Sequence, residues 1–135
     1  MSKNILVIGS TSELAKRTIE ELKNLDYNIY ATTRSVNPID EKVQEFHLDV
    51  SNVENFILLK EKLRNLEFDT IINFTGIAVA GAVVELEEIE LRKQLDINLF
   101  ALLRIIKYIA PNLSKNGKLI NISSMARYGI FPFLS

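Results

Sequence analysis

An alternation of short apolar runs with segments of helical periodicity constrains the fold more than any other feature of the sequence. The first run, Ile-Leu-Val-Ile at residues 5–8, is continuous and rich in β-branched residues, as is typical of a strand buried on both faces of a parallel sheet. It leads into Gly-Ser-Thr-Ser at residues 9–12, after which Leu14, Ile19 and Leu22 follow at helical spacing. This order of elements predicts a strand, a tight polar turn and a helix.

The same alternation continues to the end of the chain. Further strands are predicted at residues 28–33, 43–48, 70–75 and 118–122, and helices at residues 53–66 and 85–109. Loops are predicted at residues 34–41 and 77–84, and a turn at Asn116 and Gly117. Alternating strands and helices predict a single α/β domain with a doubly wound parallel sheet, helices on both of its faces and right-handed crossovers.

Composition excludes several classes of function. The 135 residues carry 16 Lys and Arg against 17 Asp and Glu, so no basic surface for a nucleic acid or an anionic membrane is expected. The longest apolar stretch is interrupted by Arg104 and Lys107 and is too short to span a bilayer. The absence of cysteine, together with a single histidine, excludes disulfides and predicts no metal centre. We expect a cytoplasmic protein.

Polar or small residues follow each predicted strand. In an open parallel sheet, ligands bind beyond the carboxyl ends of the strands. Those ends are residues 9–12, 32–35, 49–50, 73–76 and 123–124. The first is a candidate phosphate site, because a glycine turn that leads into a helix points free N–H groups at an anion. A glycine required only by the turn is the alternative for Gly9.

Taken together, these segments resemble the short-chain dehydrogenase/reductase family. Val-Ile-Gly-Ser-Thr-Ser-Glu-Leu-Ala at residues 7–15 is similar to its Thr-Gly-x-x-x-Gly-x-Gly segment but keeps only Gly9. Leu-Asp-Val at 48–50 resembles its Asp-Val pair, and Ile-Asn-Phe-Thr-Gly at 72–76 resembles its Asn-Asn-Ala-Gly segment. Asp-Ile-Asn-Leu at 96–99 is similar to the helix that carries an active-site asparagine. Gly-Lys-Leu-Ile-Asn-Ile-Ser-Ser at 117–124 resembles the fifth strand and the catalytic serine.

The resemblance implies a three-layer α/β/α Rossmann-type fold with strand order 3-2-1-4-5. It also implies an NAD(P)(H)-dependent oxidoreductase that transfers a hydride between the nicotinamide and a small-molecule carbonyl or alcohol. Catalytic positions carry over to Ser124, which would hold the substrate oxygen, and to Asn98, while Ser123 is expected to face the opposite side of its strand. Cofactor-binding positions carry over to Gly9, Ser10, Thr11, Ser12, Glu13, Leu14, Arg34, Asp49, Val50, Asn73, Thr75 and Gly76.

Two departures from the family pattern bear on the cofactor. Glu13 stands where the pattern has glycine, and its carboxylate opposes a pyrophosphate unless the side chain turns to solvent. The second strand ends in Ala-Thr-Thr-Arg-Ser without the acidic residue that would hold the ribose hydroxyls of NAD. This absence and Arg34 favour NADP(H) over NAD(H), although a solvated loop cation would give Arg34 the same appearance.

The family's catalytic tyrosine and lysine have no counterpart in the sequence. None of the four tyrosines is followed by a lysine four residues later, and the family spacing from Ser124 would place the tyrosine just beyond Ser135. We therefore expect a truncated family member, incomplete at its C-terminus, that binds the cofactor at best weakly and does not catalyse hydride transfer. The alternative is a non-catalytic nucleotide-binding or scaffold protein, and the reading frame after Ser135 would distinguish the two.

An apolar surface predicts a homo-oligomer. Family members usually pair through long helices, and the helix that would bear the tyrosine is absent from these residues. The predicted helix over 85–109 would leave Leu102, Ile105, Ile106 and Ile109 with an incomplete set of neighbours. An exposed apolar face of this kind promotes self-association.

Overall fold

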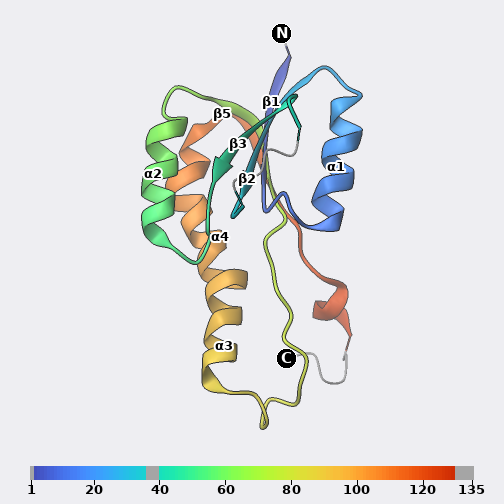
Figure 1. Cartoon of the computed structure of the whole chain (residues 1–135), viewed down its shortest axis with the longest axis vertical. Helices are drawn as coiled ribbons and strands as arrows, with labels where there is room; N and C mark the ends of the chain where they lie inside the picture. Colours follow the sequence, from blue (N-terminus) through green and yellow to red (C-terminus); the bar gives the residue numbers. More distant parts are fainter. Residues whose placement is uncertain (1, 36–39, 130–135) are drawn as a thin grey trace.

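A five-stranded parallel sheet forms the centre of the molecule (Figure 1). The computed structural model describes residues 2–35 and 40–129, so part of the loop predicted at 34–41 lies outside the described residues. Each strand pairs in parallel with its neighbours in the order β3-β2-β1-β4-β5, which confirms the predicted fold class and strand order. The strands are β1 (Lys3–Ile8), β2 (Tyr27–Thr33), β3 (Val43–His47), β4 (Phe68–Asn73) and β5 (Leu113–Asn121).

Helices cover both faces of the sheet, so the fold has three layers (Figure 1). One face is covered by α1 (Glu13–Lys23), and the other by α2 (Val53–Leu63) and the C-terminal part of a long helical rod. The rod consists of α3 (Glu88–Leu95), the π-helical turn η1 (Asp96–Phe100), α4 (Ala101–Arg104), a second π-helical turn η2 (Ile105–Ile109) and the short 3-10 helix η3 (Ala110–Asn112). A further 3-10 turn, η4 (Met125–Tyr128), follows β5. Within the described residues, no helix is both long and apolar enough to cross a membrane.

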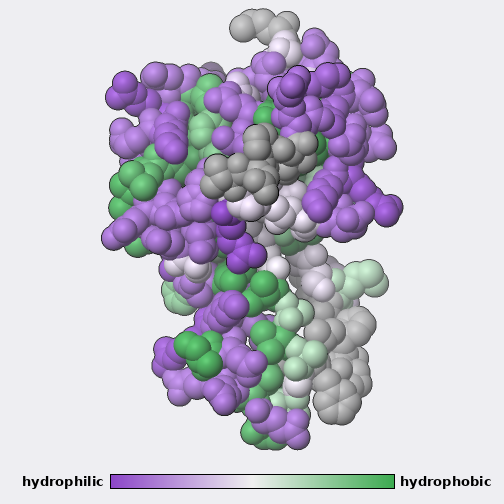
Figure 2. Space-filling view, in the orientation of Figure 1, coloured by the Kyte–Doolittle hydropathy of each residue, from purple (hydrophilic) through white to green (hydrophobic). Residues whose placement is uncertain are grey.

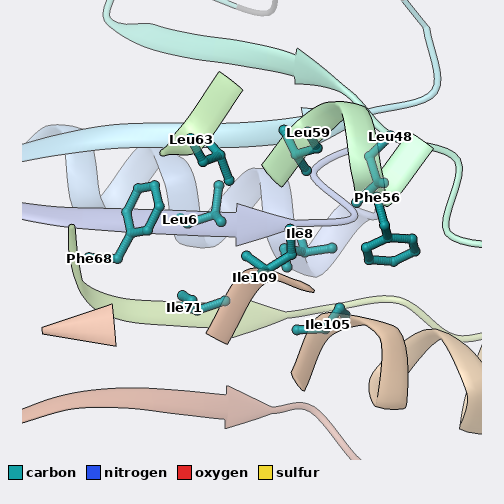
Figure 3. Packing of buried hydrophobic residues seen from close by; sticks show 10 residues of the cluster. All are labelled: Leu6, Ile8, Leu48, Phe56, Leu59, Leu63, Phe68, Ile71, Ile105 and Ile109. Carbon is teal, nitrogen blue, oxygen red and sulfur yellow. The ribbon is translucent and has the colours of Figure 1, made fainter. Parts of the chain in front are cut away.

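The core lies on both sides of β1. Leu6 and Ile8 pack in one cluster against α2 and η2 (Figure 3), whereas Ile5 and Val7 pack in a second cluster with Ile19 of α1. Successive side chains of a strand point to opposite faces, so a continuous apolar run is required where both faces are covered. The predicted burial of the first strand on both faces is confirmed.

The rod differs from the single helix predicted over residues 85–109. Its α-helix begins at Glu88, because Glu87 and Glu90 form a capping box in which each side chain accepts a hydrogen bond from the other residue's backbone N–H. The π-helical turns interrupt the regular α-helical hydrogen bonding, a feature that hydrophobic periodicity does not encode.

Strand β5 is longer than predicted and includes the predicted turn at Asn116 and Gly117. The register with β4 shifts between Phe68 and Thr70, whose partners on β5 are Leu113 and Lys118. Gly117 lies in this irregular part of the strand, where a Cβ would stand 2.9 Å from the Phe68 carbonyl oxygen. The same Cβ would lie 3.0 Å from the Ser114 nitrogen, so the glycine permits both a local bend within β5 and the close approach to β4.

The prediction of an exposed apolar surface on the rod is wrong for two of its four residues. Ile105 and Ile109 are fully buried, because they face the sheet and join the cluster around Leu6 and Ile8. Ile106 is half exposed, and Leu102 is partly buried. The exposed apolar side chains of the rod include Leu95, Leu99, Leu103 and Ile106, and self-association through them stays a prediction.

Two neighbouring leucines of α2 provide a matched test of the packing. Leu59 is 1% exposed and Leu58 is 63% exposed. We expect Leu59→Ala to lower the free energy of unfolding by about 2 to 5 kcal/mol, since it leaves a cavity between α2 and the sheet. Leu58→Ala should change it by no more than about 0.5 kcal/mol. Urea denaturation measures both values, and equal losses would contradict this placement of α2.

Candidate functional site

Two hollows lie beyond the carboxyl ends of the strands and contain most of the predicted site residues. The larger has a volume of about 700 Å³, within the range of small-molecule sites, and the smaller about 490 Å³. Of the predicted residues, the larger is lined by Gly9, Thr11, Ser12, Arg34, Asp49, Val50, Thr75 and Gly76. The smaller is lined by Asn98, Ser124, Thr75 and Gly76. Ser10, Glu13, Leu14 and Asn73 line neither hollow.

Gly9 makes a turn that only glycine accommodates readily. Its φ is +79°, and a Cβ on it would lie 3.1 Å from Thr75 Cγ2 and 3.2 Å from the Thr75 nitrogen. Both the left-handed backbone and the close approach of the chain after β4 therefore disfavour a side chain. Ser10 fixes the turn to β2, since its N–H and its hydroxyl both donate to the Thr32 carbonyl oxygen, at 3.1 and 2.9 Å.

The turn leads directly into the N-terminus of α1. The Ser12 hydroxyl caps the helix by accepting from the Ala15 N–H at 3.2 Å. The first backbone bond of the helical i to i−4 type runs from Lys16 N–H to the Ser12 carbonyl. Helix geometry leaves the N–H groups of Glu13 and Leu14 without intrahelical acceptors, which suits a phosphate at this end of the helix.

The Glu13 carboxylate is directed toward Arg17 and solvent. Its side chain is 74% exposed and forms an ion pair with Arg17, one helical turn further along, at 3.3 Å. A carboxylate turned to solvent in this way should repel a bound pyrophosphate only weakly. Glu13 therefore contributes its backbone N–H to the turn, while its carboxylate points away from it.

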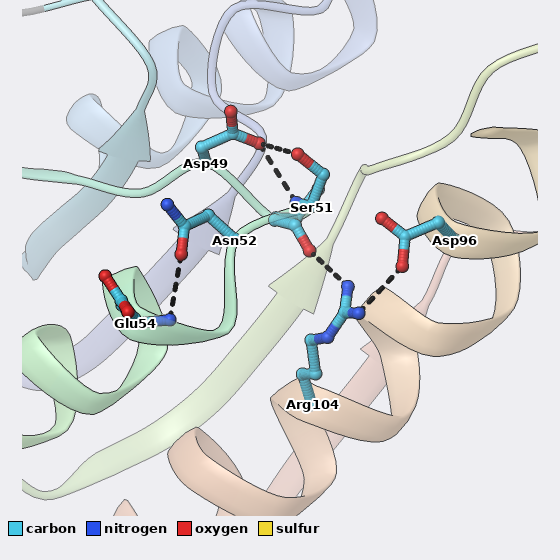
Figure 4. Close-up of polar contacts among 7 residues, drawn as sticks. Asp49, Ser51, Asn52, Glu54, Asp96 and Arg104 are labelled. Atoms are coloured by element: carbon cyan, nitrogen blue, oxygen red, sulfur yellow. Dashed lines mark hydrogen bonds and ion pairs between the residues drawn. The ribbon is translucent and has the colours of Figure 1, made fainter.

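Asp49 carries a carboxylate held in its ionised form. Its Oδ1 accepts hydrogen bonds from the Ser51 hydroxyl at 2.7 Å and from the Ser51 N–H at 2.9 Å (Figure 4). The bond from the Ser51 hydroxyl, followed by that from the Ser51 N–H, holds the pKa of Asp49 below its ordinary value. Arg34, at the end of β2, lines the same hollow as an exposed cation, and its charge acts on the Asp49 pKa in the same direction.

Asn98 joins the rod to the segment after β4. Its side-chain amide donates to the Ile77 carbonyl and accepts from the Ile77 N–H, both at 2.8 Å. The residue lies in the π-helical turn η1, as is frequent at functional sites. Both polar atoms of its side chain therefore bind the backbone, and Asn98 shapes the boundary between the two hollows.

A second asparagine organises the ends of β4 and β5. Asn73 is buried, and its Oδ1 accepts from the Thr75 N–H at 3.0 Å and from the Thr75 hydroxyl at 2.6 Å. Its Nδ2 donates to Asn121 Oδ1 at 2.7 Å. The methyl of Thr75 contacts the position of Gly9, so this network also sets the distance between the first and fourth strand ends.

Ser124 is exposed and lines the smaller hollow, as the sequence predicted for a serine at this strand end. Ser123 lines the same hollow, although it was predicted to face the opposite side. The reason is that β5 ends at Asn121, so the alternation of a strand no longer governs the two serines.

Comparison with known proteins places this arrangement in a family. Residues 3–133 match the family described as short chain dehydrogenase. The chain belongs to the short-chain dehydrogenase family.

Relatives and solved structures agree with the assignment. The chain is 30% identical over 133 residues to a 3-ketodihydrosphingosine reductase of Bacteroides thetaiotaomicron, covering 96% of the chain and 49% of that protein. A short chain dehydrogenase family protein of Francisella tularensis has the same fold, with a TM-score of 0.90, 19% identity and coverage of 99% of this chain and 56% of that one. The structure of ElxO with NADP bound gives a TM-score of 0.82 at 25% identity, covering 98% and 60% of the two chains. The chain spans about half the length of the curated relatives it matches.

Several side chains at this family site were not predicted. Ser51 positions the Asp49 carboxylate, and Ile89, Arg92, Lys93, Asp96 and Ile97 of the rod line the larger hollow. Ser51 directly follows the Asp-Val pair and was available as a signal, because an aspartate side chain commonly accepts a hydrogen bond from the backbone N–H two residues further on. The rod residues gave no signal, since their approach to the strand ends depends on how the rod packs.

The Ser51 hydrogen bonds predict the effect of one substitution. The depressed pKa of Asp49 means that its ionisation stabilises the fold above the unfolded-state pKa, and that this contribution is lost as pH falls through the folded-state pKa. In Ser51→Ala the hydroxyl bond is removed, so the Asp49 pKa should rise toward its ordinary value. A carboxyl-carbon NMR titration measures this change, with Asp69 as an internal control. An unchanged Asp49 pKa would contradict the hydrogen-bond assignment.

Proposed function

We propose that the chain forms the NADP(H)-binding part of an oxidoreductase that transfers a hydride between the nicotinamide and the carbonyl or alcohol carbon of a small molecule. The observation that carries this proposal is the composition of the larger hollow. A glycine turn at a helix N-terminus, the Asp49 carboxylate and the Arg34 cation all line it or border it. Each suits a different part of a dinucleotide phosphate.

Residues of three strand ends would hold the cofactor. The N–H groups of the turn from Gly9 to Leu14 suit the pyrophosphate, and Asp49 with the backbone of Val50 suits the adenine. Arg34 would bind the 2′-phosphate, since an arginine fork matches phosphate oxygens. Thr75, which is held by Asn73, and Gly76 line both hollows and would lie beside the nicotinamide. The cofactor, when bound, supplies the hydride donor or acceptor.

The smaller hollow would receive the substrate. Ser124 is exposed and lines it, and its hydroxyl would donate a hydrogen bond to the substrate oxygen. Asn98 would keep the hollow in shape through its two bonds to Ile77. The same hydroxyl serves a carbonyl or an alcohol, since it both donates and accepts.

The 135 residues alone are proposed to bind the cofactor without catalysing the reaction. No tyrosine among them is followed by a lysine four residues later, so the usual acid and base pair of the family is absent from these residues. If the reading frame continues past Ser135 into such a segment, the protein is the proposed enzyme. A stop codon there would favour a nucleotide-binding or scaffold protein instead.

We further propose that the exposed apolar side chains of the rod pair two copies of the chain. Leu95, Leu99, Leu103 and Ile106 are each about half exposed and recur at three- to four-residue spacing. Light scattering over a range of concentrations tests this pairing, and a monomer at all concentrations would contradict it.

The choice between NADPH and NADH gives a testable prediction of the proposed function. NADPH titration, followed by its fluorescence, should show saturation. Arg34→Ala should raise the dissociation constant for NADPH by about tenfold or more, because one charge-assisted bond to the 2′-phosphate is lost, and leave that for NADH within about twofold. Arg64→Ala, at the exposed end of α2, is the control. Absence of saturation up to millimolar NADPH would contradict the proposed function.

The orientation of Glu13 gives another prediction about cofactor binding. Because its carboxylate is exposed and paired with Arg17, Glu13→Gln should lower the dissociation constant for NADPH by no more than about threefold. Glu20→Gln, on an exposed side chain further along α1, is the matched control and should have no effect. Tightening well beyond that range at Glu13 alone would show that the carboxylate faces the phosphates.

A further inference from the structure

An arginine of the rod connects the two walls of the larger hollow. Arg104 of α4 donates from Nη1 to the Val50 carbonyl oxygen at 3.0 Å and from Nη2 to Asp96 Oδ1 at 2.7 Å (Figure 4). Val50 belongs to the loop after β3, and Asp96 begins η1. Both line the hollow, whereas Arg104 itself does not. The arginine therefore acts on the site through other residues.

The contact is sheltered from solvent. The side chain of Arg104 is 23% exposed and that of Asp96 is 31% exposed, in contrast to the paired side chains of Arg92 and Glu88 on the same rod, at 73% and 75%. A planar guanidinium presents several donors in a fixed fork and can bind two acceptors at once. Asp96 thus fixes the direction from which Arg104 reaches Val50.

The loop that Arg104 contacts carries the Asp49 carboxylate. Its two ends are already anchored, because the Leu48 N–H donates to the Thr33 carbonyl at 2.9 Å and Asn52 caps α2 through the Glu54 N–H at 2.9 Å. The bond from Arg104 holds the carbonyl between these anchors. Val50 also packs against the main core cluster, so its backbone is held from two directions.

We propose that Arg104 is a positioning residue for the adenine end of the cofactor site, an inference that rests on the proposed function. By holding the Val50 carbonyl, it orients the peptide unit between Val50 and Ser51, whose N–H donates to the Asp49 carboxylate at 2.9 Å. Arg104 thereby acts on the position of that carboxylate. Loss of the fork would leave a partly buried carbonyl without its charged donor and would let residues 49–51 adopt other conformations.

Hydrogen exchange and cofactor binding together test the proposal. The variants are Arg104→Met, which removes the fork, and Arg104→Lys, which keeps the charge but not the planar donor pair. Lys107→Met is the matched control, since it removes an exposed cation from the same rod. The backbone amides of Ser51 and Asn52 report the loop, and the amide of Leu6 in β1 reports global opening.

We expect Arg104→Met to speed exchange at Ser51 and Asn52, and to raise the dissociation constant for NADPH, each by about tenfold. Exchange at Leu6 should change much less. Arg104→Lys should recover only part of both effects and remains available if Arg104→Met does not fold. Lys107→Met should match the unsubstituted chain in both measurements.

Different results would contradict the proposed function and the positioning role of Arg104. Absence of NADPH saturation in the unsubstituted chain contradicts the proposed function itself. Saturation that Arg104→Met leaves unchanged contradicts the positioning role alone. Equal acceleration of exchange at Leu6 and at the loop would assign Arg104 a general structural role, and full recovery by Arg104→Lys would show that a point charge suffices without the fork.

Discussion

The burial of β1 between two helical layers is the interaction on which the other features depend. This strand pairs with β2 on one side and β4 on the other, and its side chains enter both core clusters. Because the strand order reverses between β1 and β4, the helix α1 that follows β1 and the rod that follows β4 pack on opposite faces of the sheet. This divergence opens a crevice at the carboxyl ends of the two strands. The glycine turn occupies that crevice, so the position of the site follows from the position of the strand.

The fold and the strand ends were predictable because their signals are local. A β-branched run and a helical period each need only a few consecutive residues, and the five strand ends then follow from the topology. Contacts between distant residues were not predictable. The Asn98 bonds to Ile77, the burial of Ile105 and the approach of Arg104 to Val50 all depend on how the rod packs against the sheet. The same limit applies to Glu13 of α1. Its residue type suggests repulsion between its carboxylate and the pyrophosphate, but only its orientation toward Arg17 shows how strong that repulsion is.

Two departures from the family pattern, Thr75 and the loss of the second and third glycines, fit together at the turn after β1. Thr75 stands where the family has a smaller residue, and its methyl contacts the space that a Gly9 side chain would fill. Its hydroxyl is bonded to Asn73, so the bulkier residue is held in a single orientation with its methyl against the turn. The cap from Ser12 completes the turn without the second and third glycines.

The charges around the larger hollow explain how a chain of net charge −1 can receive an anion. Two carboxylates line the hollow, and each is engaged within the protein: Asp49 by hydrogen bonds from Ser51, and Asp96 by the ion pair with Arg104. Arg34 and Lys93 line it as exposed cations. An ionised carboxylate that is already bonded opposes a nearby phosphate less than a free one, since part of its charge is balanced by its donors. The local balance at the hollow is therefore more favourable to an anion than the overall charge indicates, and Arg104 contributes to it as well as to the position of Val50.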